Sequence, residues 1–193
     1  MNRHQQTHYD SMYVISTWNV RSLYQVGKQC NVIQEMNRMN IDVLGISETF
    51  WDGTDDFETT LPTTGEKFRV GLIFSGGDKR RRGVAFILRN SARTAVKYYQ
   101  MISDRIICVR LKAIPVDLII IQIYAPTSDA TQDETGAFYE ELEETIKMNR
   151  KYQDCLIILD DFNGKVGDMK EEDIVGPFGL GQRNENGQNL VDC

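Results

Sequence analysis

Four short polar clusters, each directly after an apolar run, constrain this chain more than any other feature of its sequence. The runs, residues 12–17, 41–46, 118–123 and 155–159, are short, rich in β-branched residues and almost uncharged, which is typical of buried strands. Each strand would therefore deliver polar side chains at its carboxyl end. The clusters are Trp18-Asn19, Ser47-Glu48-Thr49, Tyr124-Ala125-Pro126-Thr127 and Asp160-Asp161-Phe162-Asn163.

Taken together, these polar side chains suit a site for a divalent metal and a phosphate. An Asn, a Glu, a Tyr and an Asp-x-Asn at one end of a sheet provide hard oxygen ligands for Mg²⁺, and groups that orient a water and hydrogen-bond a phosphate. A single cluster would be an ordinary polar cap, because Asn, Asp and Ser accumulate in loops. All four in this order favour a metal-dependent phosphodiesterase site.

The order TWN, SET, YAPT and DFN resembles the endonuclease/exonuclease/phosphatase superfamily, which includes DNase I, apurinic endonucleases, inositol polyphosphate phosphatases and non-LTR retrotransposon endonuclease domains. The resemblance extends from about residue 14 to residue 193. It implies a DNase I-like α/β fold, a four-layer sandwich of two mixed, largely antiparallel sheets with outer helices. The stretches similar to the craniofacial development protein 2-like branch, which derives from retrotransposon endonucleases, are TWNVRSLYQVGK, MNIDVLGISETFWDG, SDRIICVRLK, IIQIYAPTSDA and RNENGQNLVDC.

The resemblance also implies a role for each candidate site residue. Glu48, aided by Asn19, would hold the divalent metal, Mg²⁺ with Mn²⁺ as a possible substitute. Asp161 would orient or deprotonate the attacking water, and Tyr124 would contact the phosphate. Asn163 lies two residues after Asp161, on the same face if the strand continues, and would hydrogen-bond the same water or the phosphoryl oxygens.

Departures from the family pattern limit the expected activity. Asp160 replaces the usual glycine before the catalytic Asp, which places two carboxylates side by side. Arg21 stands where apurinic endonucleases have a further Asp. The family's last strands and their Ser-Asp-His motif have no counterpart after Cys193, and the only histidines, His4 and His8, precede the first strand. We therefore expect a C-terminally truncated domain with little or no nuclease activity.

Two further segments are candidates for substrate contact. Arg80, Arg81 and Arg82 lie between two strand-like stretches and are expected to form a basic hairpin tip that rests on DNA phosphates, the alternative being a solvated turn. Asn184 and Asn186 either contact the substrate backbone or cap the helix that follows them.

The rest of the sequence predicts one domain, residues 12–193, after a polar leader, residues 1–11. Helical spacing of apolar residues predicts outer helices over 26–39 and around 138–146. Short turns, one of them at Arg89-Asn90, predict antiparallel pairing of the intervening strands. Those strands are 68–75, 83–88, 94–100, 106–112 and 118–124.

Composition limits the partners and the compartment. The net charge of −6 is unusual for a protein that grips DNA, so any DNA contact must come from local basic residues. No segment is apolar enough for a signal peptide or a membrane span, and the four cysteines form no C-x-x-C pair. We expect an intracellular protein, nuclear or cytoplasmic and not secreted, with DNA as partner and without a small organic cofactor.

Three hypotheses about function remain open from the sequence. The chain is a retrotransposon-type, DNA-nicking phosphodiesterase by ancestry, or a catalytically dead remnant that acts as a binding module, or a phosphatase of phosphoinositides or other phosphoesters. Fold alone cannot separate them. The flanking sequence favours the nuclease branch over the phosphatase.

Overall fold

The computed structural model of the 193-residue chain describes residues 12–61, 68–77, 81–171 and 174–192. The predicted leader with its two histidines, the predicted contact from Arg80 and the side chain of Asp160 lie outside the described residues. In the described ranges, no helix combines the length and the apolar character needed to cross a bilayer.

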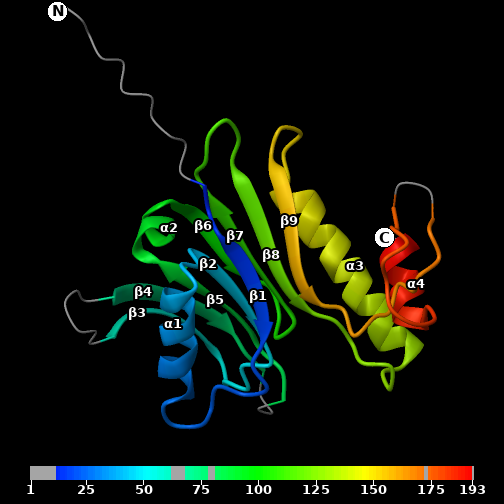
Figure 1. Cartoon of the computed structure of the whole chain (residues 1–193), viewed down its shortest axis with the longest axis horizontal. Coiled ribbons are helices and arrows are strands. Elements are labelled where there is room, and N and C mark those ends of the chain that lie inside the picture. The colour runs from blue at the N-terminus through cyan, green and yellow to red at the C-terminus, as the bar shows by residue number, and fades with distance from the viewer. Residues whose placement is uncertain (1–11, 62–67, 78–80, 172–173, 193) are drawn as a thin grey trace, which may run out of the picture.

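The chain forms two β-sheets (Figure 1). In the five-stranded sheet β1 and β2 are parallel and the other neighbours are antiparallel; in the four-stranded sheet only β8 and β9 are parallel. The first sheet has the order β1 (Ile15–Asn19), β2 (Val43–Ser47), β5 (Val84–Arg89), β4 (Phe68–Ser75), β3 (Thr54–Leu61). The second has the order β6 (Val96–Met101), β7 (Ile106–Leu111), β8 (Leu118–Tyr124), β9 (Cys155–Asp161).

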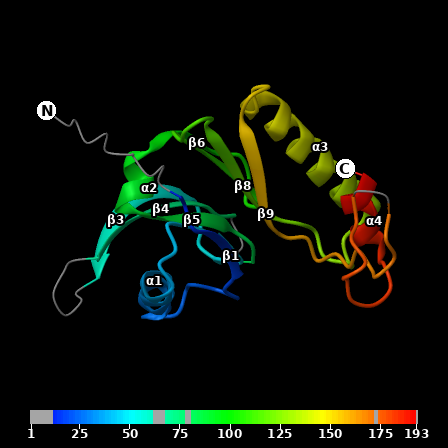
Figure 2. The same cartoon turned by 45° about the horizontal axis from the view of Figure 1, so that its top comes forward.

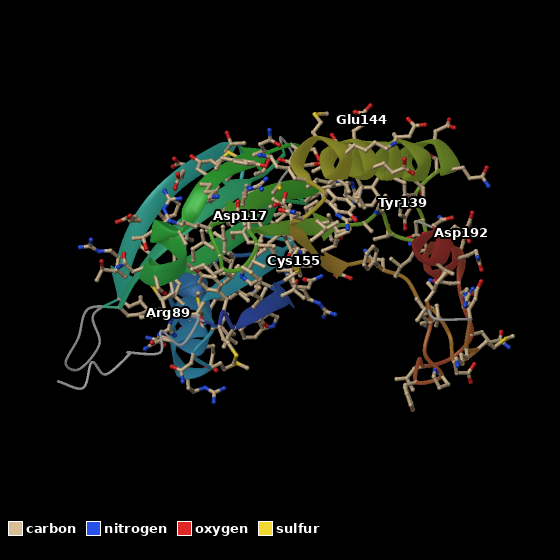
Figure 3. All side chains as sticks on the ribbon, turned by 90° about the horizontal axis from the view of Figure 1, so that it is seen from above. Arg89, Asp117, Tyr139, Glu144, Cys155 and Asp192 are labelled. Carbon is tan, nitrogen blue, oxygen red and sulfur yellow. The ribbon has the colours of Figure 1, made fainter. Side chains whose placement is uncertain are left out.

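Helices cover the outer faces of this sandwich. The helix α1 (Lys28–Arg38) packs Ile33 and Met36 against the first sheet, and in Figure 2 it lies on the opposite side of that sheet from β6. The helix α3 (Gln132–Asn149) packs Phe138 and Leu142 against the second sheet. A third apolar cluster, which includes Phe86 and Ile120, fills the space between the sheets. The predicted four-layer α/β sandwich is therefore confirmed.

Two features of the chain path differ from the sequence prediction. The strand β3 was not predicted, because its sequence TDDFETTL is polar and it lies half-exposed at the edge of the sheet. The turn predicted at Arg89-Asn90 to pair adjacent strands is wrong. The strand β5 already has β2 and β4 as its neighbours, so the short helix α2 (Asn90–Thr94) carries the chain to β6 in the other sheet.

The two sheets approach each other closely at Gly45, two residues before the end of β2. Gly45 of β2 faces the fully buried Gln122 of β8, and a Cβ atom at Gly45 would lie 2.0 Å from Gln122 Oε1. That oxygen accepts a hydrogen bond from the Thr17 hydroxyl of β1 at 3.0 Å. The absent side chain lets the sheets approach closely, and the buried amide links them.

Candidate active site

The carboxyl ends of four strands bring the predicted site residues together. The parallel registers place Asn19 beside Ser47 and Tyr124 beside Asp161. Across the sandwich, the Asn19 amide nitrogen donates to Glu48 Oε1 at 2.9 Å and to Asp161 Oδ2 at 2.5 Å. Two carboxylates, one from each half of the sandwich, thus converge on one amide group.

Tyr124, the last residue of β8, completes this cluster. Tyr124 is 8% exposed, and its hydroxyl donates a hydrogen bond to Glu48. Burial first, and then the negative charge of Glu48, raise the pKa of Tyr124 to about 12. The phenol therefore stays protonated at neutral pH and serves as a hydrogen-bond donor, as contact with a phosphate oxygen requires.

Glu48 is held in an unusual backbone conformation. Its φ is 58° and that of Phe50 is 59°, values in the left-handed region that non-glycine residues adopt at a cost of roughly 1–3 kcal/mol. Hydrogen bonds from neighbouring segments maintain it: the Ser22 N–H donates to the Glu48 carbonyl at 2.7 Å, and the Thr49 N–H donates to the Gly83 carbonyl at 3.1 Å. Such enforced strain is common where a side chain must be aimed at a functional site.

The condition for placing Asn163 on the same strand face as Asp161, that the strand continues past Asp161, is not met. The strand β9 ends at Asp161, and Asn163 has a left-handed φ of 47° in the loop that follows. Its side-chain amide donates to the Ala125 carbonyl at 3.1 Å, while its backbone N–H points to Asp161 Oδ1 at 3.4 Å. Asn163 therefore stays beside Asp161 through the loop, and its contact with water or phosphate remains a prediction.

The basic residues lie at one flank of this cluster. The predicted hairpin of β4 and β5 is confirmed, with Arg81 exposed and Arg82 3.6 Å from Asp104. Sequence reasoning missed Arg105, whose Nη1 donates to the Tyr124 carbonyl at 2.8 Å and whose guanidinium lies 5.3 Å from the Tyr124 ring centroid. Burial and the positive charge of Arg82 lower the pKa of Arg105. An arginine at the start of a strand gave no signal, because only the pairing of β7 with β8 places it beside the tyrosine.

Asn184 and Asn186 lie at the start of α4 (Glu185–Asp192). Asn184 Oδ1 accepts from the Gly187 N–H at 2.8 Å, the bond that an N-cap residue makes. Asn186 is 8% exposed and donates to backbone carbonyls of Pro126 and Asn163. The cap is thus seen for Asn184, and a substrate contact from either residue remains a prediction. A hollow of about 500 Å³ between α3 and α4 adjoins both side chains.

The side chains gathered at this site determine which metal ion it can hold. Within the described residues no three His, Cys, Asp or Glu side chains gather as a metal cage. Mg²⁺, however, is usually held by one or two carboxylates, with waters and substrate phosphates as its other ligands. Glu48 provides one such carboxylate, and Asp161 lies on the other side of the Asn19 amide. Beside Asn19, the buried Ser47 hydroxyl has no hydrogen-bond partner among the described residues, so it can accept a metal-bound water. The residues fit a hydrated Mg²⁺ ion.

Comparisons with known proteins show the family and the fold of the chain. The sequence profile of the Endonuclease/Exonuclease/phosphatase family matches residues 16–169. Craniofacial development protein 2 of Bos taurus is 40% identical over 182 residues, which are 93% of this chain and 29% of that protein. The protein of the same name from Tragulus javanicus is 39% identical, over 93% of this chain and 30% of its own length. The chain thus spans less than a third of these relatives.

Solved structures share the fold. An AP endonuclease from Archaeoglobus fulgidus superposes with a TM-score of 0.59 and 16% identity, over 94% of this chain and 69% of its own. The endonuclease domain of TRAS1, a telomere-specific non-LTR retrotransposon, superposes with a TM-score of 0.54 and 12% identity, over 94% of this chain and 68% of its own. At these identities the likeness concerns the fold alone.

Proposed function

The chain belongs to the endonuclease/exonuclease/phosphatase family, and we propose that it is a divalent-metal-dependent phosphodiesterase of the retrotransposon-endonuclease type, which nicks DNA. One observation carries the proposal: the Asn19 amide joins Glu48 and Asp161, residues from opposite sheets, at the carboxyl ends of their strands. Held this close, one carboxylate can bind a cation while the other accepts a proton from a neighbouring water.

Each residue then has a distinct task. Glu48 holds Mg²⁺ or Mn²⁺, with Asp161 facing it across Asn19. Asn19 Oδ1 accepts from the Arg21 N–H at 3.0 Å, so in this arrangement Asn19 orients the carboxylates, and ligation by Oδ1 requires its amide to turn over. When bound, the metal supplies neutralisation of the charge that develops on the phosphoryl group. Asp161 accepts the proton of the attacking water, and Tyr124 donates to a phosphate oxygen.

DNA is the proposed substrate because arginine side chains, which can bind phosphates, lie beside the carboxylates of the site. Arg81 is exposed, Arg82 lies 3.6 Å from Asp104, and Asp104 and Glu134 also act electrostatically on Arg105. This flank keeps a net positive charge next to Tyr124. It is suited to phosphates on either side of the scissile bond, and the resulting affinity should fall with salt.

A binding module without chemistry is the second candidate. The described residues contain no histidine, so no imidazole can donate a proton to the phosphate or the leaving oxygen from this part of the chain. Slow or absent turnover together with intact metal and DNA binding would distinguish this candidate from the enzyme.

Metal-dependent stability tests the site itself. A ligand that binds only the folded state adds about 2.7 kcal/mol of stability at a hundredfold excess over its Kd, so Mn²⁺ should raise the melting temperature by several degrees. Glu48→Gln should abolish this rise. Glu58→Gln, the same change on the exposed edge strand β3, should retain it. An equal rise in both variants would refute Glu48 as the ligand.

Turnover is measured separately, with supercoiled plasmid and a soluble inositol phosphate as substrates. Mg²⁺-dependent nicking that disappears in Asp161→Asn supports the nuclease, since that variant excludes a contaminating enzyme. Phosphate release from the inositol phosphate would instead indicate the phosphatase. Metal binding with neither reaction would indicate the binding module.

A further inference from the structure

The loops that leave β8 and β9 are tied together by a side chain that lies far from them in the sequence. Asn186, at the start of α4, donates from Nδ2 to the Pro126 carbonyl at 3.0 Å and to the Asn163 carbonyl at 3.4 Å. Each acceptor lies two residues beyond a site residue, Pro126 after Tyr124 and Asn163 after Asp161. A single side-chain amide thus donates to both loops, close to the site residues from which they start.

Neighbouring residues hold the start of α4 against the same loop. Asn184 Oδ1 accepts from the Lys165 N–H at 2.7 Å, and the Asn184 N–H donates to the Lys165 carbonyl at 3.1 Å. Gly187 makes this approach possible, because a Cβ atom there would lie 1.9 Å from the Lys165 carbonyl oxygen. We call Asn184, Asn186 and Gly187 the amide clamp.

The loops need this support because the sheet ladder stops at the site. The parallel pairing of β8 and β9 ends at Tyr124 and Asp161, and the last backbone bond between them runs from the Ala125 N–H to the Asp161 carbonyl at 3.2 Å. Beyond it, Asn163 lies in a left-handed conformation, and its side chain reaches back to Ala125. Side-chain amides therefore set the spacing of the two loops where the backbone ladder no longer does.

We infer that Asn186 is a positioning residue of the proposed phosphodiesterase site, one that holds the Asp161–Asn163 loop against the loop of Tyr124. The inference rests on the proposed function. A substrate contact suits Asn186 less well, since it is 8% exposed and its amide nitrogen is engaged with two carbonyls of the chain. A shift of the Asp161 loop by about 1 Å would misalign the attacking water, a displacement that lowers turnover by up to roughly a hundredfold.

The test replaces the donor without changing the shape of the side chain. Asn186→Asp keeps the volume but turns an amide donor into an acceptor that faces two carbonyls. Asn189→Asp adds the same charge to the same helix at a half-exposed residue and serves as the matched control. Asn186→Ala is the second variant, in case the aspartate does not fold. Measurements on the full 193-residue chain are plasmid-nicking kcat and KM, the Mn²⁺ binding midpoint, and hydrogen exchange of individual backbone amides.

Both Asn186 variants should lose roughly tenfold to a hundredfold in kcat, with KM for DNA and the Mn²⁺ midpoint unchanged, because Glu48 is not in the clamp. The Asn163 and Lys165 amides should exchange faster, and Asn189→Asp should behave as the unaltered protein. Wild-type kcat in both variants would overturn the inference. So would a parallel loss of Mn²⁺ binding and turnover, which a merely structural role produces.

Failure of the proposed function gives a different result. If the unaltered chain shows no Mg²⁺-dependent nicking, the phosphodiesterase proposal fails, and with it the catalytic meaning of the clamp. Hydrogen exchange then decides whether the clamp positions the loop at all. Unchanged protection of Asn163 and Lys165 in both Asn186 variants overturns that part too.

Discussion

The close approach of the two sheets at Gly45 allows a quantitative prediction about the scaffold of the site. Gly45→Ala places a methyl group where Gln122 Oε1 lies 2.0 Å away and a Leu159 methyl lies 2.9 Å away. Both neighbours are buried, so neither can move into solvent. The Gln122 side chain must shift, and with it the bond from the Thr17 hydroxyl is lost.

The expected cost follows from these two effects. Overpacking of a dense core costs about 1–3 kcal/mol. A buried hydrogen bond whose partners stay buried costs about 1–3 kcal/mol when it is broken. We therefore expect Gly45→Ala to lower the free energy of unfolding by about 2–6 kcal/mol, a large part of the stability of a typical domain.

Urea denaturation followed by circular dichroism measures this loss. With a slope of about 2 kcal/mol per molar urea, the midpoint should fall by roughly 1–3 M. Gly136→Ala is the matched control, because Gly136 lies within α3 and a Cβ atom there has nothing within 4 Å. That variant should gain about 0.5–1 kcal/mol from helix propensity. An unchanged midpoint for Gly45→Ala would refute the claim that the glycine sets the sheet spacing.

Three further outcomes follow from the site and the core. Because folding raises the pKa of Tyr124 from 10.0 to about 12, the unfolded phenol ionises first as pH rises. Stability should therefore fall between these values, and Tyr124→Phe should lessen the fall by up to about 1.4 kcal/mol per pH unit in urea titrations. Burial likewise raises the pKa of Cys108 to about 12, so an alkylating reagent at pH 8 should modify the exposed Cys155 before Cys108, as peptide mass spectrometry would show. Replacing Arg81 and Arg82 with Ser should reduce the log-log salt slope of duplex binding by about one unit per lost phosphate contact, measured by fluorescence anisotropy; equal slopes would leave these arginines as a solvated turn.

Much of the fold could be predicted from local patterns in the sequence. Apolar runs rich in β-branched or aromatic residues identified eight of the strands at or near their observed positions, and burial on both faces makes this signal strongest in strands such as β7 and β8. The amphipathic spacing of Phe138 and Leu142 located α3 for a similar reason. The polar residue at the end of each run indicated which side chains could meet at one edge. These features depend on neighbouring residues, so the sequence contains them directly.

Tertiary structure alone decided how those elements meet. Asn19 and Asp161 are 142 residues apart, and no local pattern states that the amide of one lies between two carboxylates. The crossing of α2 between sheets depends on β5 already having two neighbours, and the place of Arg105 depends on the register of β7 with β8.

The RNENG segment shows the limit most clearly. Its sequence indicated asparagines near the start of a helix, which favoured a cap over a substrate contact but excluded neither. Packing gave the two residues different partners: Asn184 caps α4 and also donates to the Asn163 carbonyl, while Asn186 donates to the carbonyls of both Pro126 and Asn163. A side chain's chemistry is set by its sequence, but its partners are set by which backbone groups the fold leaves unpaired beside it.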